Sequence, residues 1–185
     1  MNNVEWTPEW LTETIKLLRT HGSDTQFIEV KKAHGGYPGS LDATLSSFSN
    51  SSTGGIIICG LDENNDFAPV GVYDPADLEK TLGNKLRRGL KPPNTMESGT
   101  ILYEGTKIFV ATIPPLPPYE RPAYIGGKAY VRSGDGDHEM SRHETDLMVA
   151  QRTRTGFDEE PVEYTSIADL DEGLKTAYPV SYTHL

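Results

Sequence analysis

The sequence predicts an α+β domain in which a mixed β-sheet is flanked by helices. Helical and strand patterns alternate up to residue 90, and paired strands with short turns dominate after that. The apolar run Ile56–Leu61 is typical of a strand buried on both faces. A second strand is expected at 26–32, which is rich in β-branched and aromatic residues. Alternation followed by hairpins indicates the α+β class.

Capping residues and apolar spacing define the expected helices. Thr7 and Pro8 suit the cap and first turn of a helix that ends at 21–23. Ser40 is the expected cap of the second helix, because a loop rich in glycine and proline leads into it. Leucines at four-residue intervals from Leu78 to Leu90 indicate the third. The last three helices are expected over 41–49, 75–90 and 141–151.

Two hairpins should follow the third helix. Glu104-Gly105 and Gly126-Gly127 are turn sequences with apolar, β-prone residues on both sides. A short returning strand is expected over 67–72, and Pro69 places it at a sheet edge. The hairpin strands are 100–103 with 107–113, and 123–125 with 128–132; the segments 34–39, 50–55 and 133–137 are expected to be loops.

We divide the chain into an N-terminal helix (1–22), a central domain (23–151) and an acidic tail (152–185). The tail holds 3 Lys and Arg against 7 Asp and Glu and has no apolar periodicity, so little packed structure is expected there. Its last residues, 179–185, look like translated sequencing-adapter sequence. We therefore expect the natural protein to continue differently beyond residue 178.

The composition excludes several classes of protein. The longest apolar run is far shorter than a membrane span, and the N-terminus lacks the basic and apolar regions of a secretory signal. The single cysteine, Cys59, cannot form an intrachain disulfide, so we expect a cytoplasmic location and no membrane partner. A net charge of −10 opposes non-specific binding to a polyanion, although a local basic patch can still act at short range.

Charged residues come together at one predicted sheet end. Glu29 and Lys31 are two apart in a strand and therefore share a face. If the 26–32 and 56–61 strands are neighbours, Asp62 and Glu63 meet the Glu29 and Lys31 side chains there. Such a group suits phosphate recognition or metal-assisted phosphodiester chemistry. The alternative is a surface ion pair beside polar turn residues.

Basic residues supply the candidate nucleic-acid contacts. Lys85, Arg87, Arg88 and Lys91 cluster at a predicted helix end, where they are either phosphate contacts or a solvated helix C-terminus. Tyr130 and Arg132 share a strand face and suit base stacking with phosphate pairing, or are an ordinary strand face. The full candidate set is Lys31, Lys32, Lys85, Arg87, Arg88, Lys91, Tyr130, Arg132 and Arg142.

Five motifs in this order resemble the Schlafen AlbA-like domain family, over roughly residues 24–150. They are Glu29-Val30-Lys31, Ser47-Phe48-Ser49-Asn50, the strand from Gly54-Gly55 to Asp62-Glu63, Val70-Gly71, and Ala129 to Gly134. The resemblance implies a Schlafen/AlbA-like domain that binds DNA or RNA. In bacteria such a domain often begins a transcriptional regulator, whose ATP-binding part would lie in a downstream domain that this sequence does not include.

The resemblance also implies an alternative function, a metal-dependent endoribonuclease. Carried over by position, its three acids fall on Asp24, Glu29 and Glu63, which would hold Mg²⁺ or Mn²⁺, with Lys31 beside them as a fourth catalytic residue. The chain departs from the family pattern at Val30, where an aromatic is usual, at Asp24, where the family has Glu, and in a turn one residue longer before Gly55. A protein-interaction module without a nucleic-acid role is the third alternative, and homodimerisation stays open.

Overall fold

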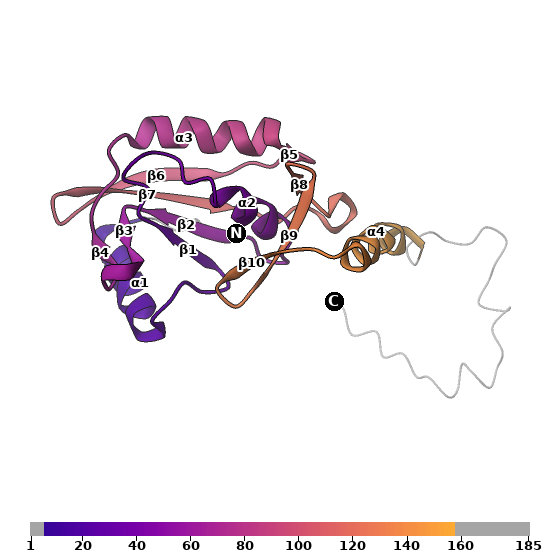
Figure 1. Ribbon diagram of the computed structural model, residues 1–185, viewed down its shortest axis with the longest axis horizontal. Coiled ribbons are helices and arrows are strands. Elements are labelled where there is room, and N and C mark those ends of the chain that lie inside the picture. Colours follow the sequence, from indigo (N-terminus) through magenta and orange to yellow (C-terminus); the bar gives the residue numbers. More distant parts are fainter. Residues whose placement is uncertain (1–5, 158–185) are drawn as a thin grey trace, which may run out of the picture. The chain divides into compact units, whose positions relative to one another are not determined.

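The computed structural model of this protein describes residues 6–157, and the chain divides into two compact units, Met1–Arg152 and Thr153–Leu185. Figure 1 shows the elements of the first unit in chain order. The helices are α1 (Pro8–His21), α2 (Leu41–Asn50), α3 (Pro75–Asn84) and α4 (Arg142–Phe157), with short helical turns η1 (Glu63–Asn65), η2 (Lys85–Gly89) and η3 (Pro118–Glu120). The strands are β1 (Ile28–Lys31), β2 (Gly55–Cys59), β3 (Leu61–Asp62), β4 (Ala68–Pro69), β5 (Leu90–Lys91), β6 (Glu97–Tyr103), β7 (Thr106–Ile113), β8 (Tyr124–Ile125), β9 (Lys128–Ser133) and β10 (Gly136–Glu139).

The central sheet has the order β1-β2-β7-β6. Strands β1 and β2 are parallel, with Glu29 opposite Ile57, and the other neighbours are antiparallel. The sheet is therefore mixed, and the predicted α+β class is confirmed. In Figure 1, α3 lies along one face of this sheet and α1 on the other.

Alternate residues of the central strands feed two separate hydrophobic cores. Ile57 and Phe109 point into the core beneath α2 and α3, whereas Ile58 and Val110 pack against Leu11 and the rest of the apolar face of α1. This two-residue alternation is what a pleated strand imposes when both of its faces are covered. The continuous apolar run in the sequence is explained by helices on both sides.

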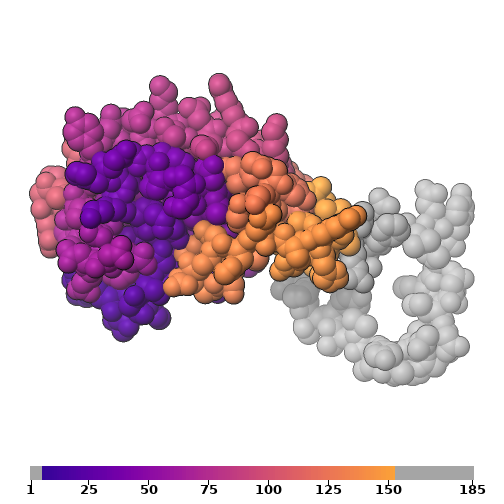
Figure 2. Space-filling model, in the orientation of Figure 1, coloured from indigo at the N-terminus to yellow at the C-terminus, as the bar shows by residue number. Residues whose placement is uncertain are grey.

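A second sheet, with the order β10-β9-β8-β5, is antiparallel throughout. Strand β9 packs against α2, and Figure 2 shows the orange β9–β10 hairpin directly against the indigo and violet N-terminal part of the domain. The short strands β3 and β4 form a third sheet of their own. Residues that are 80 and 84 positions apart in the sequence therefore bond to each other between α2 and β9.

Most predicted elements are present where the patterns place them. Thr7 caps α1 by accepting a hydrogen bond from the Trp10 N–H, and Gly22 ends the helix in the left-handed conformation. Both predicted hairpins are confirmed as β6–β7 and β8–β9.

Several details of the sequence interpretation are wrong. Residues 133–137 are not a loop, because Gly136 and Asp137 belong to strand β10. Ser40 makes no side-chain cap bond, since its backbone is already helical. The apolar strand breaks at Gly60, whose φ of +108° ends β2 before β3 begins. The 67–72 strand is only two residues long, and α4 continues to Phe157.

The third helix changes character near its end. Regular α-helix stops at Asn84, and residues 85–89 form one π-helical turn before β5. A π turn carries an extra residue and shifts the following side chains around the helix axis. This turn carries Lys85, Arg87 and Arg88, and Lys91 follows it in β5.

Two adjacent glycines are required at the entry to β2. A Cβ on Gly54 would lie 2.2 Å from the Ile113 carbonyl oxygen, and one on Gly55 would lie 2.5 Å from the Phe48 ring. Both contacts are far inside normal packing distance. The last turn of α2 can therefore approach β2 only because Gly55 has no side chain, and the chain can pass the Ile113 carbonyl of β7 only because Gly54 has none.

In the described part of the chain, none of the helices combines the length and apolarity needed to cross a membrane. The predicted tail lies outside the described residues from position 158 onward, and this includes the segment 179–185.

Candidate functional site

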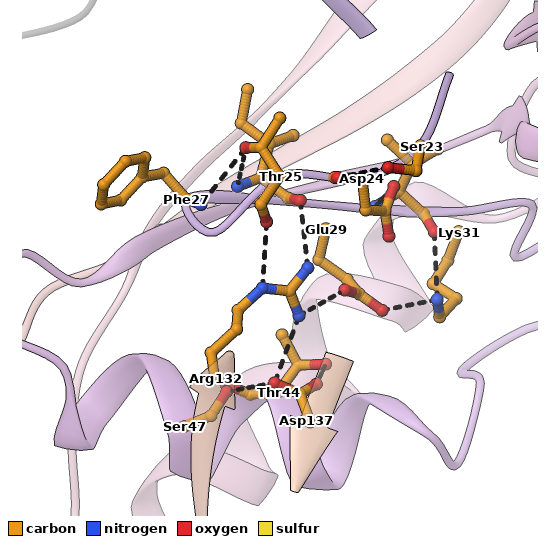
Figure 3. Close-up of polar contacts among 12 residues, drawn as sticks. Ser23, Asp24, Thr25, Phe27, Glu29, Lys31, Thr44, Ser47, Arg132 and Asp137 are labelled. Carbon is orange, nitrogen blue, oxygen red and sulfur yellow. Dashed lines mark hydrogen bonds and ion pairs between the residues drawn. The ribbon is translucent and has the colours of Figure 1, made fainter. Parts of the chain in front are cut away.

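Glu29 and Lys31 meet at the edge of the central sheet, and Arg132 lies at the centre of the charged group there. Asp62, which the sequence placed in the same group, pairs with Lys32 instead. The Arg132 side chain is only 2% exposed, and its Nη1 lies 2.7 Å from Glu29 Oε2 and 3.2 Å from Asp137 Oδ1. The guanidinium also stacks on the Phe48 ring, 5.2 Å from its centroid. Figure 3 shows these groups converging from β1, β9 and β10. The arginine therefore ties the two sheets together.

The same guanidinium holds the chain just before β1. Arg132 Nε donates to the Thr25 carbonyl at 3.0 Å, and Nη2 donates to the Ile28 carbonyl at 3.2 Å. The strand β1 is at the edge of its sheet, so these carbonyl groups depend on partners outside that sheet. Arginine suits this position because its planar fork donates in several directions at once.

Glu29 is bound by a cation on each side. Its Oε1 lies 2.5 Å from Lys31 Nζ, while Oε2 faces Arg132. Glu29 and Lys31 therefore share one strand face, as their spacing predicts. Burial lowers the pKa of Lys31, but its bond to Glu29 and the nearby carboxylates outweigh this and raise that pKa overall.

Asp137 completes the network from the opposite strand. Its Oδ1 accepts a hydrogen bond from Ser47 Oγ at 2.5 Å, and its Oδ2 accepts one from Thr44 Oγ1 at 2.7 Å. Two hydroxyl groups of α2 thus hold the carboxylate against Arg132. Sequence analysis missed Asp137 because it assigned residues 133–137 to a loop. Pairing the strand that holds Tyr130 and Arg132 with a returning strand would have placed Asp137 opposite Arg132.

Asp24 lies at the margin of this network. Burial, together with the negative charges of Glu29 and Glu63, raises the pKa of Asp24 to about 7. A hydrogen bond from the Val30 N–H and the charge of Lys31 act in the opposite direction. Glu63 itself is exposed on the turn η1, whereas Asp24 and Glu29 are buried.

The three acids do not fit a metal ion. Within residues 6–157, no group of three His, Cys, Asp or Glu side chains is arranged to hold one. The reason is local: both oxygens of Glu29 face cations, and Asp24 Oδ1 accepts a backbone N–H. A metal site built from Asp24, Glu29 and Glu63 would have to displace Arg132 and Lys31. We therefore derive no metal-assisted step.

Helix α2 is joined to the second sheet by its polar side chains. Asn50 accepts a hydrogen bond from the Ala123 N–H and donates to the carbonyl groups of Ala123 and Tyr130. Ser46 Oγ donates to the Ala123 carbonyl and accepts from the Tyr130 N–H. Ser46 and Asn50 thus supply bonds that a neighbouring strand would otherwise give.

The basic residues separate into paired and unpaired groups. Lys32 pairs with Asp62 at 2.6 Å, and Lys85 pairs with Asp42 at 2.7 Å while its Nζ lies over the Tyr37 ring. The remaining cations of the π turn and its flanks are exposed and form no ion pair among the described residues. They are Lys80, Arg87, Arg88 and Lys91.

Residues 80–96 form a segment, here called the basic segment, with five Lys and Arg and no Asp or Glu. Within it, Thr81, Asn84 and Arg88 line a surface hollow beside Lys85. Lys80 was not singled out by sequence because an acid precedes it directly; the absence of acids over the next sixteen positions is the signal that could have found it.

Three other predicted contacts lie elsewhere. Arg132 is not available to nucleic acid, because all of its donors face the protein interior. Tyr130 shares the same inward strand face and packs, half-buried, on the core beneath α2. Arg142 is fully accessible on α4, with only a 3.8 Å contact to Asp146. The prediction that Tyr130 and Arg132 form an outward reading surface is therefore wrong for Arg132.

Comparison with known protein families finds a domain family that matches most of the described chain. The family model described as "Schlafen, AlbA_2" matches residues 24–141. A search of curated protein sequences finds no match.

Two solved structures share the architecture. One is the N-terminal domain of a protein from Nitrosomonas europaea named as related to the ATP-dependent DNA helicase RecG, with a TM-score of 0.56 and 23% identity over 75% of this chain and 97% of that one. The other is the DIP2311 protein from Corynebacterium diphtheriae, with a TM-score of 0.52 and 16% identity over 91% of this chain and 38% of that one. At these identities the likeness concerns the fold alone.

Proposed function

Because the chain belongs to the Schlafen AlbA_2 domain family, we propose that it binds nucleic acid through its basic segment and is the N-terminal module of a bacterial-type transcriptional regulator. One observation carries the proposal. On a chain of net charge −10, the basic segment has no acid, and Arg87, Arg88 and Lys91 are exposed without ion pairs among the described residues. Unpaired cations gathered in one segment are the usual means of contacting phosphates.

The modular part of the proposal is supported by the structural neighbours. The matched domain from Nitrosomonas europaea is the N-terminal domain of its protein, and the chain covers only 38% of the DIP2311 protein. An N-terminal module of this kind would bind DNA or RNA for the other domains of the regulator.

The π turn gives the basic segment its shape. Arg88, Asn84 and Thr81 line one hollow, so a guanidinium, an amide and a hydroxyl are available to a single phosphate group. Lys85 lies beside them but is held by Asp42, which fixes its position and weakens its own attraction for phosphate. Arg88 is therefore the expected principal contact.

The experiment compares two double variants at several salt concentrations. Arg87→Ala/Arg88→Ala removes two charges from the basic segment; Lys16→Ala/Lys107→Ala removes two exposed lysines elsewhere. Binding of a labelled duplex and of a labelled single strand is measured by fluorescence anisotropy. We expect the first variant alone to weaken binding and to reduce the slope of log K against log salt by about 2.

Two results would contradict the proposal. Equal effects of the two variants would mean that bulk charge alone matters. A wild-type protein that binds no nucleic acid, or binds it without salt dependence, would favour the protein-interaction module that the acidic composition also allows.

A further inference from the structure

We propose that Phe27 is a stacking platform for an unpaired base, so that the domain takes single-stranded nucleic acid at a second site outside the basic segment. This deepens the proposed function and rests on it. Phe27 stands directly before β1 and is 51% exposed. Exposed aromatic rings are the common means by which proteins hold unpaired bases.

The ring separates two hollows in the surface. One, of about 590 Å³, is lined by Leu17 and His21 of α1 and by the turn between β9 and β10. The other is lined by Ser47, Ser52 and Val131. Gln26 and Phe27 line both. A base that covers the ring therefore has room on either side of it for the neighbouring nucleotides.

The groups around the ring suit the edge of a base better than a phosphate. Among the described residues, the Gln26 amide and the Ser52 hydroxyl have no hydrogen-bond partner. An amide presents a donor and an acceptor together, as base edges require. The cation in the second hollow, Arg132, is fully engaged by its carboxylate and carbonyl partners. A phosphate would find no free Lys or Arg there.

The segment that carries Phe27 is held in place before any ligand arrives. Thr25 Oγ1 accepts hydrogen bonds from the N–H groups of Phe27 and Ile28, and the Phe27 carbonyl accepts one from the Ile56 N–H at 2.8 Å. Arg132 fixes the Thr25 carbonyl from the opposite side. Figure 3 shows this anchoring, with the Phe27 ring pointing away from the buried ion network. The ion network is thus a positioning device for the platform.

The test uses the full chain and two labelled probes, an oligouridylate of ~15 nucleotides, near the upper end of known site sizes, and an RNA duplex of the same length. We compare Phe27→Ala, Phe27→Trp and a matched control, Leu102→Ala, which truncates a side chain that is 68% exposed on β6. Thermal unfolding confirms that each variant is folded, which is expected because both sites are exposed.

We expect Phe27→Ala to weaken single-strand binding by about 5- to 150-fold, the loss of one base–aromatic stack, and to leave duplex binding and the salt slope unchanged. Phe27→Trp should retain single-strand binding, and Leu102→Ala should match wild type. Unchanged single-strand affinity in Phe27→Ala would overturn the platform. If wild type binds neither probe, the proposed function fails as well, so the two failures are distinguishable.

Discussion

Arg132 and Tyr130 share one face of β9, and the sequence alone does not tell whether that face meets a ligand or the protein interior. The fold turns both side chains inward, where the guanidinium finds two carboxylates, two carbonyl groups and an aromatic ring. A buried arginine with this many partners stabilises the folded state only while all of them are present. The contribution of Arg132 to stability can therefore be measured as the loss in free energy of unfolding when it is replaced.

Replacing Arg132 with methionine should lower the free energy of unfolding by about 3–5 kcal/mol, because Glu29 and Asp137 would each lose a buried countercharge. Arg132→Lys should recover only part of this, since an ammonium cannot reproduce the fork. Urea denaturation measures the difference, and Arg87→Met, on the surface, should stay within about 0.5 kcal/mol of wild type. Wild-type stability combined with weaker nucleic-acid binding in Arg132→Met would show instead that the guanidinium contacts the ligand.

Helix α2 illustrates how an element with a weak hydrophobic pattern can lie at the centre of a fold. All but two of its ten residues are buried, although three of them are serines and one is an asparagine. Ser46 and Asn50 bond to the backbone of Ala123 and Tyr130, and Ser47 bonds to Asp137. Ser49 bonds to Leu45 and Asn94, so these four side chains are buried without being left unpaired.

The Asn50 amide is the most heavily used of these side chains. Asn50→Ala should lower the free energy of unfolding by about 1–3 kcal/mol for each buried backbone group left unpaired, and should speed hydrogen exchange at the Ala123 amide. Denaturation and exchange measured by NMR check both. Ser52→Ala, which removes an unpaired hydroxyl near the same helix end, is the control. Unaltered exchange at Ala123 would mean that the asparagine does not hold that strand.

Charge is strongly segregated over the whole molecule. The basic segment has five cations and no acid, whereas residues 158–185 hold seven acids and one lysine. A polyanion approaching this chain therefore meets a repulsive field from the molecule as a whole and an attractive one only near the basic segment.

Ending the chain after Phe157 changes the net charge from −10 to −4 and keeps every described element. We expect this to speed association with nucleic acid on the order of tenfold at low salt, and to have little effect at high salt, where the field is screened. Stopped-flow fluorescence measures the rate. A full-length variant with the seven acids replaced by Asn and Gln should behave in the same way. If it behaves like wild type, the tail acts through something other than its charge.

The sequence by itself determined which segments form the sheet, its helices and its hairpins, because periodicity, caps and turn residues are local properties. It also determined that Glu29 and Lys31 share a face, since strand geometry allows nothing else. Only the tertiary structure decided that Arg132 takes the second oxygen of Glu29, that Asp137 lies in a strand and that α2 is buried all round. Those outcomes depend on contacts between residues 73 to 107 positions apart, and the partners meet only when the two sheets pack together.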